Sequence, residues 1–447
     1  MAKIIPFRGI FYNPDKIHNL AEVMTPPYDI ILKQDQCNFY KQSPYNIVRL
    51  DLGKLTKKDT DKNNRYTRAA NLLNKWISEK ILVQDTSPAF YLTTVDFTLG
   101  NKRVTRSGLI ALVRLEPFNK GIILPHEKTF SKVSAERFEL IKACHANFSS
   151  IFSLYSDQNI ILDSLKDAVC SKKPDMDFID KQGMKHRLWR ITDSSVHRYV
   201  ADAMQEKSLF IADGHHRYET ALNYKNRLAG TMPDFNDDNP VNYVMMYLCS
   251  MEDPGLVILP AHRMLTGIKD STLASFIQKA ENYFYIKKIP FQNKGMEKAK
   301  TNFISALQSN SSKNMIGAFM KTRQEFYLLT LKPNVMKHVT YDNLPNSLKS
   351  DPLKNLDVTV LTRLILMEIL GFDQSMLDNE KLIAYSSSEE KAIQEVVSDR
   401  CDITFILNPT KINQVREIAQ QGLIMPRKST YFYPKVITGQ MINSLTP

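Results

Sequence analysis

The chain has 447 residues, of which 43% are hydrophobic and 24% are charged, close to the average of soluble globular proteins. This composition excludes a disordered or fibrous protein, because it supplies enough apolar side chains to bury a large core. The formal net charge is +12 at pH 7, from 59 Lys and Arg against 47 Asp and Glu. It favours anionic partners such as phosphate-bearing small molecules or nucleic acid, although a basic, solvated surface would give the same balance.

Cysteine usage and the first residues of the chain indicate the compartment. The five cysteines are far apart and form no CxxC pair, so neither a disulfide framework nor a cysteine zinc site is indicated. Pro6 and Arg8 precede any apolar stretch of signal-peptide length, and nowhere do 18 apolar residues follow one another. We therefore expect a cytoplasmic protein with no membrane partner and leave its oligomeric state open.

The first part of the chain is expected to contain short strands, a helix and a hairpin. Residues 1–55 have the pattern of short strands and turns. Apolar residues at helical spacing predict an amphipathic helix over 68–81. The runs 90–99 and 103–115 are rich in β-branched and aromatic residues and are separated by Gly100-Asn101, which predicts a β-hairpin.

The remaining chain alternates helical and extended patterns. A helix is expected over 134–147, and a strand over 209–212 leads into a helix that ends near Gly230. The other expected elements are strands over 243–248, 256–259, 315–320, 325–331 and 403–407 and helices over 271–283, 356–370 and 411–421. Because hairpins and strand–helix units are mixed without regular βαβ alternation, the fold class expected is α+β, with an additional α/β C-terminal region.

The segment Ile211–Glu219, with the sequence IADGHHRYE, is the sharpest local signal. It places a strand, an acidic residue, a glycine and three cation-capable donors at the start of a helix. The free N–H groups of a helix N-terminus attract anions, and Gly214 lets the backbone approach a ligand closely. His215, His216 and Arg217 would add side-chain donors, and Arg217 can bind a phosphate with two parallel hydrogen bonds.

Asp213, at the end of the predicted strand, is a candidate for binding Mg²⁺ or accepting a proton. An alternative interpretation is a structural turn in which Asp213 caps the helix and the two histidines are ordinary buried polar groups. A zinc site on His215 and His216 is disfavoured, because adjacent histidines on a helix diverge by about 100°.

A second cluster, Pro125–Thr129, has the sequence PHEKT and follows an apolar run. Glu127, Lys128 and Thr129 supply a carboxylate, a cation and a hydroxyl group, although a charged loop would have the same composition. The HExxH pattern is absent, which excludes that metalloprotease class. Neither a P-loop nor GxGxxG occurs in the chain, so the P-loop, Rossmann and protein-kinase classes are also excluded.

A third cluster, RKSTYFYPK over 427–435, mixes cations, hydroxyl groups and aromatic rings. Lys428, Ser429 and Thr430 could contact phosphates while the aromatic rings stack on a base. A basic strand with alternating buried aromatic residues is the alternative. Three polar residues near the N-terminus are further candidates for substrate binding: Asp29, Asn46 and Arg49.

Seven segments of the chain are similar, in order, to the bacterial and archaeal domain-of-unknown-function family 1015: PFRGIFYN, TPPYDII, SPYNIVRLDLGK, LPHEKTF, ANFSSIFSLYSD, ADGHHRYETALNY and MPRKSTYFYPK. This resemblance extends over nearly the whole chain. Within it, DGHHRYE also resembles the phosphate-binding motif of the ParB/sulfiredoxin superfamily, whose members bind or use nucleotides and of which one branch comprises free L-serine kinases. The resemblance implies three regions: an N-terminal α+β region over 1–115, a ParB/sulfiredoxin-like core over 116–265 and a C-terminal α/β region over 266–447.

The resemblance also implies a function and roles for residues. It implies a phosphotransferase that uses ATP and Mg²⁺ and acts on a small hydroxyl compound, with free L-serine as the first candidate. The nucleotide or phosphate site would lie on Asp213, Gly214, His215, His216 and Arg217, and the second catalytic strip on Glu127, Lys128 and Thr129. Asp213 would bind Mg²⁺ or orient the hydroxyl group, Glu127 would take its proton, and Lys128 would contact the transferred phosphate.

Two other functions remain open from the sequence. One is a non-enzymatic, ParB-like protein that binds nucleotide or nucleic acid, with the positive charge facing DNA. The sequence shows no helix-turn-helix, zinc-finger or RNP signature that would support base recognition. The other is a phosphatase or another hydrolase that uses the same site.

Overall fold

The computed structural model describes residues 1–127, 131–292, 295–321, 323–339 and 352–446. The chain divides into two compact units. Unit 1 comprises Met1–Val257 together with Phe432–Pro447, and unit 2 comprises Ile258–Tyr431. The chain passes from unit 1 to unit 2 within β13 (Val257–Leu259) and returns within β20 (Tyr431–Tyr433).

Unit 1 is built on a nine-stranded sheet with the order β6-β11-β8-β12-β5-β4-β10-β9, in which β1 also pairs with β5. Its strands are β1 (Ile4–Ile5), β4 (Phe90–Leu99), β5 (Lys102–Arg114), β6 (Ile123–Leu124), β8 (Ile151–Tyr155), β9 (Met176–Ile179), β10 (Lys185–Ile191), β11 (Leu209–Asp213) and β12 (Tyr243–Ser250). The pairs β6–β11 and β8–β12 are parallel, and the other pairs are antiparallel. Two further small sheets join β2 (Ile10–Tyr12) to β3 (Leu82–Gln84) and β7 (Ala146–Asn147) to β21 (Asn443–Ser444).

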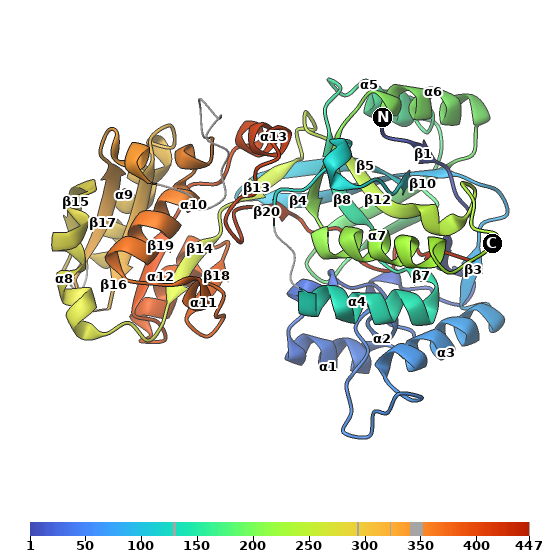
Figure 1. Ribbon diagram of the computed structural model, residues 1–447, viewed down its shortest axis with the longest axis horizontal. Coiled ribbons are helices and arrows are strands. Elements are labelled where there is room, and N and C mark those ends of the chain that lie inside the picture. Colours follow the sequence, from blue (N-terminus) through green and yellow to red (C-terminus); the bar gives the residue numbers. More distant parts are fainter. Residues whose placement is uncertain (128–130, 293–294, 322, 340–351, 447) are drawn as a thin grey trace. The chain divides into compact units, whose positions relative to one another are not determined.

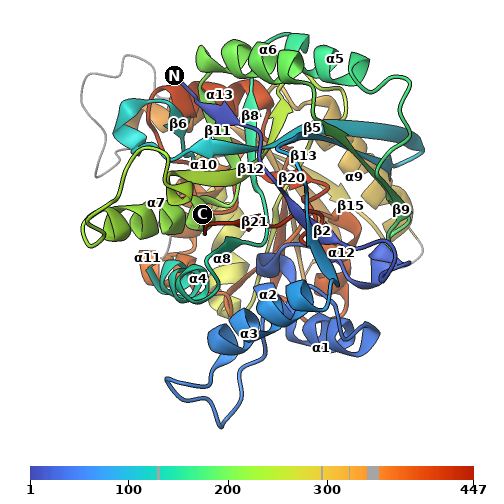
Figure 2. The same ribbon diagram turned by 90° about the vertical axis from the view of Figure 1, so that its right-hand side faces the viewer.

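The helices of unit 1 bury apolar side chains against this sheet and against each other. They are α1 (Lys33–Gln42), α2 (Val48–Asp51), α3 (Arg65–Ser78), α4 (Ser131–Cys144), α5 (Ile160–Asp167), α6 (Ser194–Gln205) and α7 (His215–Ala229). Leucine and isoleucine side chains of α5, Val200 and Met204 of α6, and Tyr218 and Ala221 of α7 share one core with the sheet. Figure 1 shows α4 and α7 side by side, and Figure 2 shows α5 next to α6. The site described below lies where α7 begins.

Unit 2 has a six-stranded antiparallel sheet with the order β15-β17-β16-β19-β14-β18. Its strands are β14 (His262–Leu265), β15 (Phe284–Pro290), β16 (Met315–Met320), β17 (Glu325–Leu331), β18 (Ile383–Ser386) and β19 (Ile403–Ile406). Its helices are α8 (Asp270–Ala280), α9 (Met296–Ser309), α10 (Asp357–Val360), which continues as a π-helix over Leu361–Ile369, α11 (Gln374–Leu377), α12 (Glu389–Val397) and α13 (Ile412–Gln420). The core containing α8 and the π-helix is distinct from the core containing α9 and α12, because alternate residues of β16 point to opposite faces of the sheet.

These units confirm the mixture of helices and sheets expected from the sequence. The predicted hairpin is also confirmed, since β4 and β5 pair around Gly100 and Asn101 with Leu99 opposite Lys102. The three regions inferred from the sequence are divided differently in the structure. The predicted boundary at position 115 falls within one sheet, because β12 pairs with β5. Residues 432–447, predicted to be part of the C-terminal region, belong to unit 1.

The prediction of only short strands and turns over residues 1–55 is wrong, because α1 is a helix of ten residues. None of its residues is buried, so its sequence carries no apolar stripe that would reveal helical periodicity. Among the described residues, none of the helices combines the length and apolar character needed to cross a bilayer.

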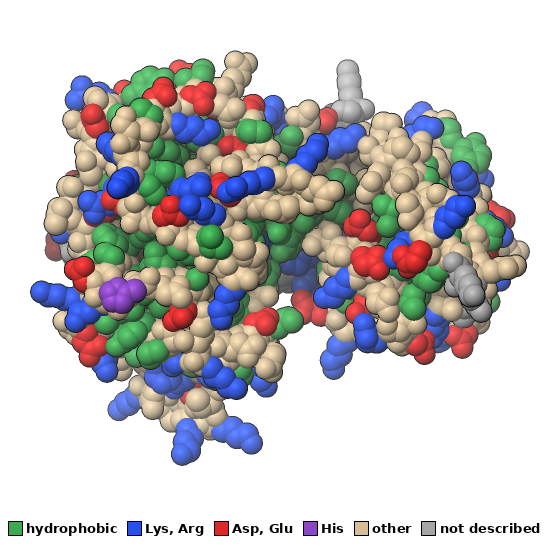
Figure 3. All heavy atoms as spheres, turned by 180° about the vertical axis from the view of Figure 1, so that it is seen from behind, with side chains coloured by type: hydrophobic (Ala, Val, Ile, Leu, Met, Phe, Trp, Pro, Cys, Tyr) green, Lys and Arg blue, Asp and Glu red, His purple; other side chains and the backbone are tan. Residues whose placement is uncertain are grey.

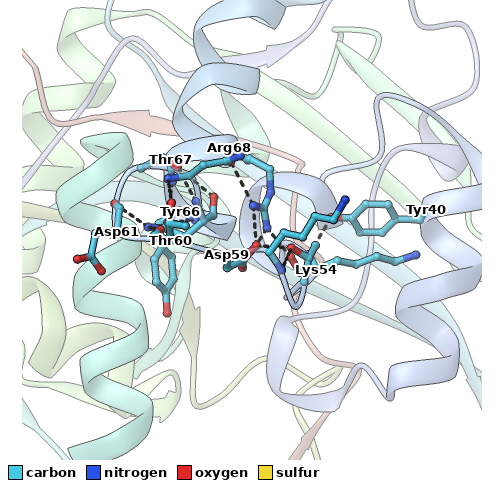
Figure 4. A network of polar contacts seen from close by, with 12 residues as sticks. Tyr40, Lys54, Asp59, Thr60, Asp61, Tyr66, Thr67 and Arg68 are labelled. Atoms are coloured by element: carbon cyan, nitrogen blue, oxygen red, sulfur yellow. Dashed lines mark hydrogen bonds and ion pairs between the residues drawn. The ribbon is translucent and has the colours of Figure 1, made fainter.

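The polar loop before α3 is held in place by hydrogen bonds, shown in Figure 4. Arg68 donates to both carboxylate oxygens of Asp59, at 2.8 and 3.2 Å, and to the Lys54 carbonyl at 2.8 Å. The Asn64 side chain accepts hydrogen bonds from the first N–H groups of α3 and so caps that helix. The lysine-rich loop is therefore anchored to the helix that follows it.

Candidate functional site

The two central sequence motifs meet at one edge of the large sheet. β6 and β11 are parallel neighbours in which Leu124 lies opposite Phe210. Because parallel strands end at the same edge, the residues that follow them lie close together. Glu127 and Asp213 each stand three residues beyond this pair in the sequence. The structure therefore brings the described part of the segment PHEKT close to the segment DGHHR.

A direct contact joins the two segments. The backbone N–H of His126 donates to Nε2 of His215 at 3.3 Å, and the two imidazole rings stand nearly perpendicular with centroids 4.7 Å apart. Both side chains are buried. This contact fixes the backbone next to Glu127 against the first residue of α7.

Asp213 lies between two cations at the end of β11. Its Oδ2 accepts a hydrogen bond from Arg217 at 2.7 Å, and its Oδ1 accepts one from Nζ of Lys435. Burial raises the pKa of the Asp213 carboxyl group, but the charges of Lys435 and Arg217 outweigh it and hold the pKa below its ordinary value. Asp213 is therefore ionised at neutral pH, and the three groups together carry one net positive charge.

Arg217 and Lys435 are each held by further contacts. Arg217 donates to the Ser149 hydroxyl at 3.0 Å and to the Ser150 carbonyl at 2.6 Å. The residue before Lys435 is fixed by Arg106, a buried side chain of β5 that donates to the Pro434 carbonyl at 2.5 Å. Both cations are thus placed beside the start of α7 by contacts from distant parts of unit 1.

The start of α7 has the geometry of an anion site. The residue before the helix, Gly214, has φ +97° and ψ +26°, and no side chain caps the first turn. The first N–H groups of a helix have no partner within it and carry partial positive charge, so an anion can bind there. Gly214 is needed for conformation and for space, because a Cβ atom at this position would lie 2.9 Å from Nε and Nη2 of Arg217.

Replacing Gly214 by alanine is expected to lower the free energy of unfolding by about 1–3 kcal/mol, since alanine is strained at this φ. Gly230, at the other end of the same helix, provides a matched control, because it has φ −83° and the nearest atom to an added Cβ would be 3.6 Å away. Gly230→Ala is expected to change stability by less than about 1 kcal/mol. Urea unfolding of both variants tests this. Equal effects at the two positions would contradict it.

His126 and His215 are both neutral at pH 7. Burial lowers the pKa of His126 to about 4, and burial together with His126 lowers the pKa of His215. Since Nε2 of His215 accepts the His126 N–H, its proton lies on Nδ1. His215 therefore contributes position rather than charge to the anion site. His216 is only partly buried.

The neutral state of His126 predicts a pH-dependent stability. The unfolded chain binds a proton at this histidine near its ordinary pKa of about 6.5, whereas the folded chain does so only near pH 4, so stability falls as the pH falls between these values. From pH 7.5 to 5.5 we expect wild type to lose about 1 kcal/mol more than His126→Asn. Urea unfolding at the two pH values measures this. His18→Asn, at an exposed histidine, is the control, and a pH dependence that His126→Asn shares with wild type would refute the assignment.

The arrangement around Asp213 does not fit a resident metal ion. Both carboxylate oxygens already accept hydrogen bonds from cations. Within the described ranges, no group of three or more His, Cys, Asp or Glu side chains is arranged to hold a metal ion.

The predicted substrate-binding residues have other surroundings. Asn46 donates to the Glu22 carbonyl at 2.7 Å and accepts the Val48 N–H at 3.0 Å, so it supports the start of α2. Arg49 donates to the Tyr40 carbonyl at 2.7 Å, with its guanidinium group over the Tyr40 ring. These contacts tie Asn46 and Arg49 to the N-terminal segment. Asp29, by contrast, is exposed and interacts electrostatically with Arg217.

The other predicted residues lie elsewhere. Lys128 and Thr129 are outside the described residues. Lys428, Ser429 and Thr430 belong to unit 2, where Arg263 donates to the Lys428 carbonyl at 3.0 Å and Thr410 donates to the Ser429 carbonyl at 2.8 Å. Ser429 and Thr430 are buried there.

Several residues of the site were not selected from the sequence: His126, Ser149, Ser150 and Lys435. Each nevertheless falls inside one of the segments that resemble the family, namely LPHEKTF, ANFSSIFSLYSD and MPRKSTYFYPK. Those segments are the only signal in the sequence that could have identified them. Because Asp213 and Lys435 are 222 positions apart, no local pattern in the sequence indicates their contact.

Comparison with known proteins assigns the chain to a family. The family described as "Protein of unknown function (DUF1015)" matches residues 4–359, most of the chain, so the protein belongs to this family. This confirms the resemblance found in the sequence. No curated protein matches the chain.

Three solved structures are weakly similar. A free serine kinase variant in complex with ADP is 10% identical, with a TM-score of 0.34, over 73% of this chain and 87% of that chain. A conserved hypothetical protein from Pyrococcus furiosus is 12% identical, with a TM-score of 0.33, over 76% of this chain and 95% of that chain. SbnI with a C-terminal truncation, from Staphylococcus aureus, is 9% identical, with a TM-score of 0.33, over 74% of this chain and 86% of that chain.

Proposed function

We propose that this protein is a phosphotransferase that moves the γ-phosphoryl group of ATP to the hydroxyl group of a small compound. The first candidate for this compound is free L-serine. The observation that carries the proposal is the contact of His126, the residue before Glu127, with the first residue of α7 at the carboxyl ends of two parallel strands. One segment supplies an anion site, and the other supplies a carboxylate that can accept a proton. The resemblance of DGHHRYE to its superfamily motif supports a ParB/sulfiredoxin-like core in unit 1. The five widely spaced cysteines, which form no CxxC pair, support a cytoplasmic location.

The phosphates of ATP would bind at the start of α7. The helix N-terminus attracts them. Arg217 and Lys435 add two positive charges, and the negative charge of Asp213 leaves a net charge of +1. Because Asp213 and the neighbouring carbonyl and hydroxyl groups already fix these cations, little reorganisation is needed when charge develops during the transfer. Mg²⁺ would enter as part of the nucleotide substrate and would neutralise part of the phosphate charge.

The transfer needs a group that removes the hydroxyl proton. In the proposed reaction the serine oxygen forms a bond to the γ-phosphorus, while the bond from that phosphorus to the oxygen bridging to the β-phosphate breaks. Glu127 accepts the hydroxyl proton, and ADP leaves with the bridging oxygen. Lys128 and Thr129 follow Glu127 directly in the sequence, and their roles as phosphate contacts stay predictions from the sequence.

The distribution of charge on the face of unit 1 seen in Figure 3 does not favour the alternative of a DNA-binding protein. Figure 3 shows Lys and Arg side chains of unit 1 in several separate places on the face in view, interspersed with Asp and Glu side chains. Duplex DNA is usually bound by a continuous basic patch or stripe.

The proposal is tested by incubating the purified protein with ATP, Mg²⁺ and a panel of hydroxy compounds, and identifying phosphorylated products by mass spectrometry. The panel contains L-serine, D-serine, L-threonine and glycerol. Formation of O-phosphoserine together with an equal amount of ADP is expected. Nucleotide binding without transfer to any compound would contradict the proposal. Tight binding to duplex DNA with a steep salt dependence would favour the alternative.

A further inference from the structure

A cavity of about 50 Å³ lies inside unit 1, next to the phosphate site. Its wall includes Asp51 from α2, Arg137 from α4, Arg217 from α7, and Asn147 and Ser149 from the segment before β8. Charged groups of both signs therefore face one small space. Since Arg217 lines this cavity and also binds Asp213, a single side chain connects the cavity to the proposed phosphate site.

Arg137, which lines this cavity, is a buried cation with an incomplete set of hydrogen bonds. Its side chain is only 7% exposed, and it donates through Nη1 to Oδ1 of Asp51 at 2.9 Å. Its guanidinium group lies 3.9 Å from the centre of the Tyr28 ring. No described residue accepts a hydrogen bond from its buried Nε. Leaving a buried donor unsatisfied is costly, so a negatively charged group beside the Arg137 guanidinium would stabilise it.

The size of the cavity limits what can occupy it. A volume of about 50 Å³ corresponds to roughly three or four positions of a water molecule. That space matches a group with few heavy atoms and is too small for a nucleoside. The nucleoside must therefore bind elsewhere, and only a small group can enter the cavity.

We infer that this cavity binds the head group of a small α-amino acid, with its carboxylate at Arg137 and its ammonium group at Asp51. This inference rests on the proposed function, since it assigns the position of the hydroxyl substrate. A zwitterion fits the pair better than a simple anion or cation, because each of its charges meets an opposite charge. The Ser149 hydroxyl, already held by Arg217, can donate a second hydrogen bond to the carboxylate.

Calorimetric titration of the protein, alone and with ADP present, tests the inference. We expect L-serine to bind, whereas 3-hydroxypropionate, which lacks the ammonium group, and ethanolamine, which lacks the carboxylate, bind at least about tenfold more weakly. The paired variant D51N/R137Q is expected to weaken L-serine binding at least about tenfold as well. Both charges are removed together so that neither is left buried alone.

A second ion pair of unit 1 provides the matched control. Arg190 and Asp85 form an ion pair at 2.5 Å, with Asp85 only 3% exposed, and neither lines the cavity. The variant D85N/R190Q should bind L-serine like wild type. Equal affinity of wild type and D51N/R137Q for L-serine would overturn the inference, as would tight binding of ethanolamine.

The two proposals fail in different ways. If L-serine binds and D51N/R137Q weakens it, but no phosphoserine forms, the cavity assignment stands and the proposed reaction is wrong. If phosphoserine forms and D51N/R137Q leaves the KM for L-serine unchanged, the reaction stands and the cavity assignment is wrong.

Discussion

Replacing Asp213 by asparagine is expected to lower the free energy of unfolding by about 3–5 kcal/mol, because it removes the negative charge shared by two buried cations. Asp213 accepts hydrogen bonds from Lys435 and Arg217, whose side chains are 11% and 12% exposed. The asparagine keeps the shape of the side chain and loses the charge. Arg217 retains its contacts with Ser149 and Ser150, so the main loss falls on Lys435.

Urea unfolding of Asp213→Asn, Lys435→Gln and the double variant D213N/K435Q measures this effect. The double variant should be more stable than the sum of the two single losses predicts, since removing both charges leaves neither of them alone in the interior. A change of less than about 0.5 kcal/mol in Asp213→Asn would contradict the role of Asp213 as the shared counter-charge. Additive losses in the double variant would show that the two side chains do not interact.

The ion pairs of Asp213 also set its chemical role. A carboxylate whose two oxygens both accept hydrogen bonds from cations is a poor metal ligand and a poor base, because its protonated form is disfavoured. In the proposed reaction, Asp213 would therefore orient the cations that bind phosphate, and Glu127 would be the carboxylate that exchanges a proton with the substrate.

The sequence predicts the local parts of this site because they depend on short-range rules. The apolar run before Asp213 and the glycine after it indicate a strand that turns into a helix, and the structure has β11 ending at Asp213 and α7 beginning at His215. The helix expected over 68–81 is observed as α3 at Arg65–Ser78, since its apolar residues repeat at helical spacing.

The assembly of the site depends on pairings between distant residues, which periodicity does not encode. Neither the parallel pairing of β6 with β11 nor the arrival of Lys435 at Asp213 leaves a local signal. The adjacency of PHEKT and DGHHR could be expected from the sequence only through the family resemblance, which assigns both motifs to one site. The cavity lined by Asp51 and Arg137 was missed for the same reason, because its two charges lie 86 positions apart.

Replacing Glu127 by glutamine is expected to lower kcat for serine phosphorylation by about 10²–10⁴-fold, the usual effect of removing a general base. Glutamine preserves the size of the side chain and its ability to accept a hydrogen bond, but it cannot take up the hydroxyl proton. The KM for ATP should change little, because the proposed function places the phosphates at the start of α7 and not at residue 127. Steady-state kinetics with mass-spectrometric detection of O-phosphoserine measures both constants.

Two comparisons separate the loss of a base from a loss of structure. Glu139→Gln removes a half-exposed carboxylate from α4, where Glu139 pairs with Lys142, and should leave kcat unchanged. Urea unfolding of Glu127→Gln should match wild type, since this residue is only partly buried at the sheet edge. In wild type, kcat should fall at low pH as the base becomes protonated, and the residual rate of Glu127→Gln should lack that fall. A Glu127→Gln variant with wild-type kcat would show that another group, or the substrate itself, removes the proton, and the carboxylate at the end of β6 would then have no part in the transfer.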